Sequence, residues 1–282
     1  MLNHRQEFSI EAMSMILNVS TSGYYEWLHR EPSKRQNDNK MLLTKIENIF
    51  NDYFKRYGSP RVYQELRSAG EHVGENRVAK IMAKNGMKSI YNTRKKVKTT
   101  ISNHSFPVSP NLLNRNFNPA ESDLVWVSDI TYIHSQIGWL YLCQVKDLYS
   151  KRIVGWSIAT HMRTEMVIEA LQMAIDQRGV RKGLLFHSDR GSQYCSNEFR
   201  KVLQFRGIIS SMSRKGNCWD NAPAESFFAT LKCELVYHVV FKNLDDARRQ
   251  IFHYIEFFYN RIRRHSALGY LSPMQFEKLN AA

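Results

Sequence analysis

The sequence is poor in cysteine, and its few cysteines lack the spacing of a metal site. Four occur in 282 residues, at Cys143, Cys195, Cys218 and Cys233. They form no CxxC pair and have no histidine neighbour at zinc-ligand spacing, which argues against a zinc module and a disulfide framework. We therefore expect reduced thiols in a cytoplasmic protein.

Long apolar runs are also missing. No stretch of 18 apolar residues occurs, so the sequence predicts no transmembrane helix and no membrane partner. The first residues, MLNHRQEFSIEAM, lack the apolar core of a signal peptide. The sequence also contains no heptad run of the kind that predicts a coiled coil. The remaining composition, 43% hydrophobic and 12% aromatic, is typical of a globular protein of roughly one to three domains.

Positive charge is what the chain has in excess. Lys and Arg number 40 against 26 Asp and Glu, which gives a formal net charge of +14. Such an excess indicates a polyanionic partner, usually nucleic acid, although a merely basic protein has the same composition. Residues 1–118 hold 19 Lys and Arg against 10 Asp and Glu, so we expect the first part of the chain to grip DNA.

Residues 8–30 predict two short helices. Apolar residues recur at helical spacing up to Leu17, residues 18–20 interrupt the pattern, and Thr21 or Ser22 can cap a second helix. A helix-turn-helix and an ordinary helical hairpin fit this segment equally well.

Residues 41–86 give a stronger pattern of three helices, the first near 41–54. Pro60 suits the start of the second helix, and a turn follows at Ala69 and Gly70. The third helix has a basic polar side, as a recognition helix in a major groove requires. That side carries Arg77, Lys80 and Lys84. A DNA-binding helix-turn-helix is favoured here over a solvated helical bundle.

The segment 88–98, KSIYNTRKKVK, is rich in basic residues and has no acidic residue. Beside a helix-turn-helix this favours an arm that contacts phosphates, although a solvated basic loop is the alternative. The candidate contacts are Arg94, Lys95 and Lys96. Residues 99–122 are rich in Asn, Ser and Pro and lack periodicity, which predicts a linker.

From residue 123 the pattern changes to strands. The runs DLVWVSDITYI, GWLYLCQVKDLY and KRIVGWSIAT predict an antiparallel meander, after which helices alternate with short strands. This order is that of the ribonuclease H-like fold, in which the first and fourth strands are neighbours. We expect an α/β protein whose ribonuclease H-like catalytic core, a mixed five-stranded sheet with flanking helices, follows all-α helix-turn-helix modules. The expected units are 1–36 (helix-turn-helix-like), 37–98 (DNA-binding helix-turn-helix with the basic arm), 99–122 (linker), 123–240 (catalytic core) and 241–282 (C-terminal helical extension).

Three acidic residues have an informative spacing. Asp129 lies within the first predicted strand, Asp189 directly after the fourth, and Glu225 in the first turn of a helix. Residues 130–188 separate the first two, and the 35 residues 190–224 separate the last two. Three convergent carboxylates on a rigid frame can hold two divalent cations for phosphodiester chemistry. Taken singly, each acid has an ordinary alternative, as a buried salt-bridge partner, a turn residue or a first-turn glutamate.

Lys232 and the segment 211–222 add candidate DNA contacts. Lys232 follows Glu225 by seven residues and therefore returns to the same stripe of the helix. The segment, SMSRKGNCWDNA, is small, polar and basic, and predicts a mobile active-site loop or a plain surface loop. Its candidate contacts are Arg214, Lys215 and Trp219, the last for stacking on a base. We interpret Asp147 as a turn or salt-bridge residue and Asp220 as a loop or cap residue.

Six segments carry a resemblance to a known family: VWVSDITYI, GWLYL, RIVGWSI, HSDRGSQY, SRKGNCWDNAPAESFFATLK and YNRIRRHSALGYLSPMQFE. They resemble bacterial insertion-sequence transposases of the DDE, retroviral-integrase-like superfamily, in particular the second-reading-frame product of the insertion-sequence-three family. The segment KRYGSPRVYQELRSAG resembles the helix-turn-helix of that family. The three acids match the family's catalytic triad, including the 35-residue gap and the basic residue at Lys232.

The resemblance implies a mechanism and partners. Asp129, Asp189 and Glu225 would hold two Mg²⁺ or Mn²⁺ ions for a cleavage that frees a 3′-OH at the element end and for direct strand transfer by that 3′-OH. The implied partners are the terminal inverted repeats, target DNA, further copies of the chain and the upstream-frame protein, in a bacterial cytoplasm at the nucleoid. The alternative is a catalytically silent DNA-binding regulator of a fused transposase, against which the intact triad argues.

Overall fold

The structure is a computed structural model that describes residues 1–92, 107–215 and 217–280. The predicted arm residues Arg94, Lys95 and Lys96 lie outside the described residues. None of the helices in these ranges is long and apolar enough to cross a membrane.

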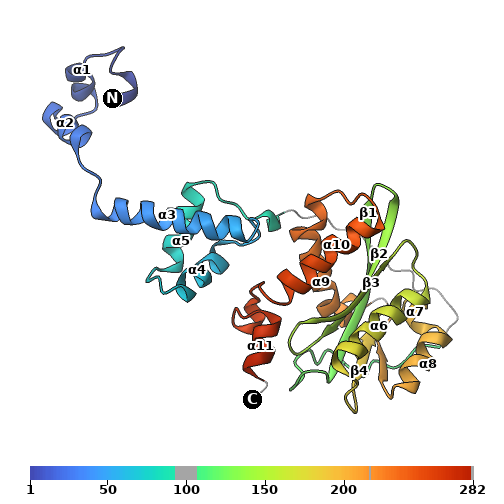
Figure 1. Cartoon of the computed structure of the whole chain (residues 1–282). Helices are drawn as coiled ribbons and strands as arrows, with labels where there is room; N and C mark the ends of the chain where they lie inside the picture. The colour runs from blue at the N-terminus through green and yellow to red at the C-terminus, as the bar shows by residue number, and fades with distance from the viewer. Residues whose placement is uncertain (93–106, 216, 281–282) are drawn as a thin grey trace.

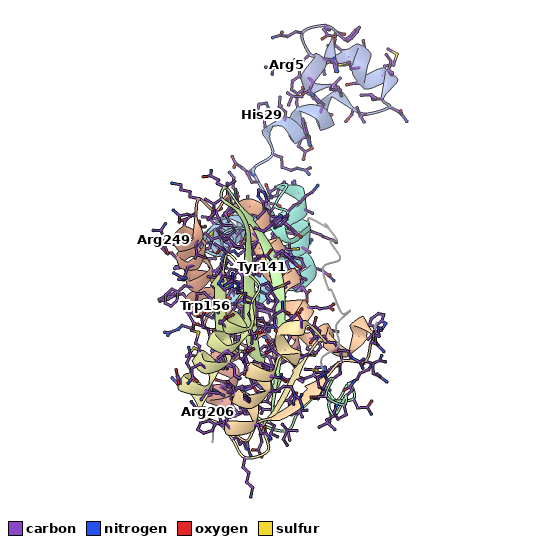
Figure 2. All side chains as sticks on the ribbon, turned by 90° about the vertical axis from the view of Figure 1, so that its right-hand side faces the viewer. Arg5, His29, Tyr141, Trp156, Arg206 and Arg249 are labelled. Carbon is purple, nitrogen blue, oxygen red and sulfur yellow. The ribbon has the colours of Figure 1, made fainter. Side chains whose placement is uncertain are left out.

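The first helices stand apart from the rest of the chain. A short 3₁₀ turn, η1 (Leu2–His4), precedes α1 (Ile10–Ile16) and α2 (Thr21–His29). Ser9 and Ser20 cap the two helices by accepting from backbone N–H groups of their first turns. Both views show this pair joined to the next helix by one extended segment (Figure 1, Figure 2). The predicted two short helices at 8–30 are thus present.

A three-helix unit follows. It consists of α3 (Lys34–Asp52), α4 (Ser59–Ser68) and α5 (Glu75–Lys84), and η2 (Ile90–Asn92) comes after it. Ser33 and Gln36 form a capping box that starts α3. The helix therefore begins before the apolar pattern does, and the unit boundary predicted after residue 36 lies inside it. Ile46, Val62 and Val78 pack together with no solvent exposure.

The predicted mixed five-stranded sheet is confirmed. An antiparallel meander of β1 (Val125–Ser135), β2 (Gly138–Asp147) and β3 (Ile153–Ala159) is extended by two parallel strands, β4 (Leu185–Ser188) and β5 (Ile209–Met212). The strand order is β3-β2-β1-β4-β5. β1 and β4 are therefore neighbours, as the ribonuclease H-like order predicts.

Helices cover both faces of this sheet (Figure 1). On one face lie α6 (Thr164–Arg178), α7 (Ser192–Cys195) and α8 (Asn197–Phe205), over the side chains of Trp126, Cys143 and Val154. On the other lie α9 (Ala222–Glu234), α10 (Leu244–Phe252) and the π-helix η5 (His253–Tyr259). The predicted C-terminal helical extension therefore changes from α to π geometry at His253. Short 3₁₀ turns occur at η3 (Cys218–Asn221), η4 (Val236–His238) and η6 (Ser266–Leu268).

The described part of the expected linker packs on the core. The Ser211 hydroxyl of β5 accepts from the backbone N–H groups of Leu112 and Leu113, and the Met212 N–H donates to the Pro110 carbonyl. Leu113 is buried beside Val127. One buried leucine and hydrogen bonds to β5 thus hold residues without sequence periodicity against the sheet edge.

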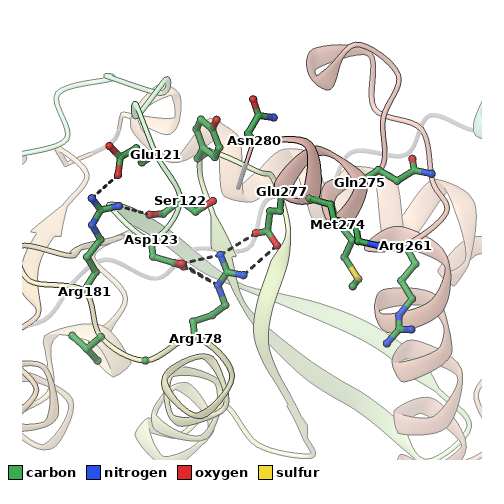
Figure 3. A pocket seen from close by; sticks show the side chains of 14 residues that line it. Glu121, Ser122, Asp123, Arg178, Arg181, Arg261, Met274, Gln275, Glu277 and Asn280 are labelled. Atoms are coloured by element: carbon green, nitrogen blue, oxygen red, sulfur yellow. Dashed lines mark hydrogen bonds and ion pairs between the residues drawn. The ribbon is translucent and has the colours of Figure 1, made fainter. Parts of the chain in front are cut away.

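The C-terminal helix α11 (Pro273–Leu279) is tied to the core by an ion-pair network (Figure 3). Arg178 of α6 reaches Asp123 at 2.8 Å and Glu277 of α11 at 3.0 Å. Arg152 reaches the same glutamate at 2.8 Å. The cleft around this network is lined by none of the three predicted acids.

The three-helix unit contacts the core through α9 and η5. Its apolar side chains belong to one buried cluster with those of both helices. The Arg56 guanidinium lies 4.5 Å from the ring centre of Phe258, and Arg264 pairs with Glu65 of α4. The helix that carries Glu225 is therefore in packing contact with the predicted DNA-binding unit.

Candidate active site

Asp129 lies in the centre of the sheet. It is the fifth residue of β1, with β2 on one side and β4 on the other, and its side chain is half-buried. The Ile130 N–H donates to its Oδ1 at 2.8 Å. The strand thus presents a carboxylate on the sheet face that α9 covers.

Asp189 lies beside Asp129. It directly follows β4, and the Gly191 N–H donates to its Oδ1 at 2.9 Å, which forms a tight turn at the strand end. In the parallel pair, Val127 of β1 is opposite His187 of β4. Each acid comes two residues further along its strand, so both lie at the same level of the sheet.

Glu225 lies in the first turn of α9, where its side chain is exposed. The preceding Pro223 fits this position because the first helical N–H groups have no partner within the helix. The inner side of α9 buries Phe227 and Leu231 against the sheet. Lys232, two turns further along, is half-buried.

The pKa shifts of Asp129, Glu225 and Lys232 depend on neighbouring charges of the same set of residues. Burial raises the pKa of Asp129 well above its usual value, the charges of Asp189 and Glu225 raise it further, and Lys232 opposes the rise. Partial burial and then Asp189 raise the pKa of Glu225. Burial lowers the pKa of Lys232, and the charge of Asp129 opposes this. The negative charges of Asp189 and Glu225 therefore disfavour ionisation of Asp129, and the positive charge of Lys232 favours it.

The donor set suits a hard divalent cation. Carboxylate oxygens are the ligands that Mg²⁺ and Mn²⁺ prefer, and the mutual repulsion of the acids is relieved by added positive charge. Within the described ranges, no three His, Cys, Asp or Glu side chains are close enough to form a ready-made metal cage. Asp129 is half-buried and Glu225 is exposed, so the two carboxylates differ in their access to solvent.

Lys146 supports the start of α9, and the sequence interpretation missed it. Its side chain is buried on β2, and its Nζ donates to the Pro223 carbonyl at 2.9 Å. A second contact reaches the Ser226 hydroxyl at 3.4 Å. The available signal was a lysine inside the otherwise apolar run of GWLYLCQVKD. Asp147, the next residue, accepts from the N–H and hydroxyl of Ser150 and so organises the turn after β2.

Asp220 anchors the loop before α9. Its buried carboxylate accepts from Arg214 and Arg115 and from the Asn111 side chain. The hydrogen bonds from Arg214 lower the pKa of Asp220 most. Beside this anchor, the Trp219 side chain is 69% exposed. Arg214 is therefore engaged in holding the loop, whereas Trp219 is presented to solvent.

His187 joins the same loop to the sheet. It is buried in β4, and burial lowers its pKa to about 4, so it is neutral at pH 7. Its Nε2 lies 3.1 Å from the Asp220 carbonyl, which can only accept, and its Nδ1 lies 2.9 Å from the Ser211 hydroxyl. The Nε2–H tautomer satisfies both contacts.

The predicted DNA contacts of the three-helix unit belong to α5. Lys80 and Lys84 are exposed. Arg77 is half-buried, and its Nε donates to the Asn39 side chain at 2.9 Å. Lys215, in the loop before α9, is exposed.

Comparison with known proteins gives matches along nearly the whole chain. The family described as "Integrase core domain" matches residues 119–218, a second family of the same description matches 225–280, and an "HTH-like domain" matches 36–96. An insertion element IS600 uncharacterized 31 kDa protein of Shigella sonnei is 44% identical, covering 94% of this chain and 97% of that protein. Transposase InsF for insertion sequence IS3A of Escherichia coli (strain K12) is 40% identical, covering 99% and 97%.

Solved structures of viral integrases are more distant. A simian T-cell lymphotropic virus intasome aligns with a TM-score of 0.49 and 14% identity, covering 82% of this chain and 73% of that one. The HTLV-2 integrase catalytic core domain in complex with magnesium aligns with a TM-score of 0.45 and 16% identity, covering 56% and 99%.

Proposed function

Because this chain belongs to the IS3 family of insertion-sequence transposases, we propose that it is a DDE-type polynucleotidyl transferase that cuts and joins DNA at element ends. The reaction frees a 3′-OH at each end and then uses it to attack a second phosphodiester, without a covalent enzyme intermediate. The proposal is supported above all by the register that puts Asp129 and Asp189 at the same level of neighbouring strands, and by the charge of Glu225, which raises the pKa of Asp129.

The residues divide the work of the site. Asp129, Asp189 and Glu225 would hold two Mg²⁺ ions, for which Mn²⁺ substitutes, and bound there the ions would stabilise charge on the attacking and leaving oxygens. Lys232 lies within the field of Asp129 and is placed to meet a DNA phosphate. Trp219, exposed in the loop before α9, supplies a flat surface on which a base stacks.

DNA is held mainly by the first part of the chain. The exposed Lys80 and Lys84 of α5, with Arg77, give the recognition helix a basic outer face. Arg94, Lys95 and Lys96 add phosphate contacts, and Lys215 does so near the active site. Arg214 adds another there, because its side chain stays 49% exposed while it holds Asp220. The ligands are the terminal inverted repeats and target DNA, on which several copies of the chain assemble because two ends must be held together. The upstream-frame protein is a further partner, and the bacterial nucleoid is the site of action.

The test is cleavage and joining of end DNA by the purified chain. Asp189→Asn and Glu225→Gln are each expected to abolish Mg²⁺-dependent cleavage and strand transfer while end binding in a gel-shift assay persists. The matched control is Glu198→Gln, because Glu198 is also an exposed first-turn glutamate, at the start of α8. Normal joining by both acid variants would refute the assignment of the site. A wild-type chain that binds ends but does not nick them with Mn²⁺ would instead be the silent regulator.

A further inference from the structure

Gln144 faces the same side of the sheet as Asp129. In the antiparallel pair of β1 and β2, Asp129 is directly opposite Gln144. Side chains at directly opposite positions point to the same face, with their Cβ atoms about 4.5–5.5 Å apart. On its other side Gln144 is opposite Trp156 of β3, which belongs to the cluster under α9 and η5. The amide is therefore a neighbour of the first acid of the site.

The Gln144 side chain is buried without a partner. Its residue has 0% exposure, and among the described residues neither its Nε2 nor its Oε1 has a hydrogen-bond partner. A buried amide in this condition costs stability, because water no longer hydrates it and nothing replaces the water. An apolar side chain of similar size would fill the position with less penalty.

Lys146 gives the contrast on the same strand and face. It is equally surrounded by the core, yet its Nζ donates to the Pro223 carbonyl at 2.9 Å. Lys146 thus has a partner at the start of α9. Gln144 lies opposite Asp129, and the two N–H donors and one acceptor oxygen of its amide have no hydrogen-bond partner among the described residues.

We propose that Gln144 is a positioning residue for the active site, whose side-chain amide donates to the Asp129 carboxylate when divalent cations draw that carboxylate into their coordination. The proposal rests on the proposed function. A carboxylate that binds a cation keeps free lone pairs, and a donor on them fixes its orientation. The Ile130 N–H already donates to Oδ1 of Asp129. A second hydrogen bond, from the Gln144 amide, would restrict the Asp129 side chain to a single rotamer.

The decisive variant is Gln144→Met, which keeps an unbranched side chain and removes the amide. We expect its thermal midpoint without divalent cations to equal or exceed that of the wild type. We expect its Mn²⁺ dissociation constant, measured by calorimetry without DNA, to rise about 10–100-fold. Single-turnover cleavage should require correspondingly more Mg²⁺. Leu142→Met is the matched control, because Leu142 is buried on the same strand and face without a polar group.

The outcomes separate this proposal from the proposed function. An unchanged Mn²⁺ dissociation constant and Mg²⁺ requirement in Gln144→Met, with wild-type cleavage present and Asp189→Asn inactive, would overturn the role of Gln144 alone. A wild-type chain without Mn²⁺ binding or cleavage would overturn both. If Gln144→Met melts earlier than the wild type, the cation titration is made on the folded variant below its midpoint, where the same shift is expected.

Discussion

Arg263 and Glu234 form a buried ion pair in which Nη2 lies 2.8 Å from Oε1. Glu234 ends α9, and its carboxylate also accepts from the Tyr254 hydroxyl at 2.9 Å. Arg61 of α4 lies 3.6 Å from the same carboxylate. The helix that carries Glu225 at its start is therefore fastened at its end to the three-helix unit and to the segment after η5.

Removal of one partner should be costly. Arg263→Met leaves the Glu234 charge buried with less compensation, and we expect the free energy of unfolding to fall by about 3–5 kcal/mol. Urea denaturation followed by circular dichroism measures it. Arg248→Met removes an exposed arginine paired with Asp245, and should change stability by less than about 1 kcal/mol. Equal losses of unfolding free energy in the two variants would show that the buried ion pair stabilises the fold no more than the exposed pair does.

Gly155 allows α6 to lie close against β3. A Cβ built at this position would come within 2.1 Å of the Ala170 carbonyl and 2.8 Å of the Ala174 nitrogen. Both atoms are backbone, so Gly155→Ala must shift the helix, and we expect a loss of at least about 1–3 kcal/mol in urea denaturation. Gly74→Ala is the control, since no atom lies within 4 Å there and only an N-cap preference changes. If Gly155→Ala were as stable as the control, α6 could move away from β3 without loss of unfolding free energy.

The sequence predicted what depends on local pattern. The apolar period of 3.6 predicted the three helices α3, α4 and α5, and the strand pattern around Asp129 predicted β1. The order of the elements then placed Asp129 beside Asp189, because ribonuclease H-like topology makes their strands neighbours.

Features that depend on long-range partners were not predictable in this way. Leu113 docks the expected linker on the sheet through contacts with distant residues. Gln144 and Lys146 stand in an apolar run whose sequence does not reveal which face meets α9. The acidic–basic pairing of Glu234 with Arg263 likewise requires the fold, because either residue alone resembles a solvated charge.

Stability should depend on pH through Lys146. Burial lowers the pKa of its ammonium group from 10.5 to about 7. The unfolded chain therefore binds more protons than the folded one between these values, so the site makes stability rise with pH across that window. The unfolding free energy of the wild type, minus that of Lys146→Met, should increase with pH above pH 7. The increase should be up to about 1.4 kcal/mol per pH unit. Urea denaturation from pH 6 to 9 measures it, with the exposed Lys201→Met as the charge-removal control. If the unfolding free energies of wild type and Lys146→Met changed with pH in parallel, the lowered pKa of Lys146 would be contradicted.

Trp219 should matter for DNA and not for stability. Its side chain is 69% exposed beside the anchored Asp220, so Trp219→Ala removes little packing and should leave the thermal midpoint unchanged. If a base stacks on the indole, the loss in binding of single-stranded or frayed end DNA is about 1–3 kcal/mol, measured by fluorescence anisotropy. Phe205→Ala is the control, because Phe205 is an 86% exposed aromatic residue at the end of α8. Equal DNA affinity for the two variants would make Trp219 an ordinary surface residue. Binding of DNA by this loop would then depend on phosphate contacts alone.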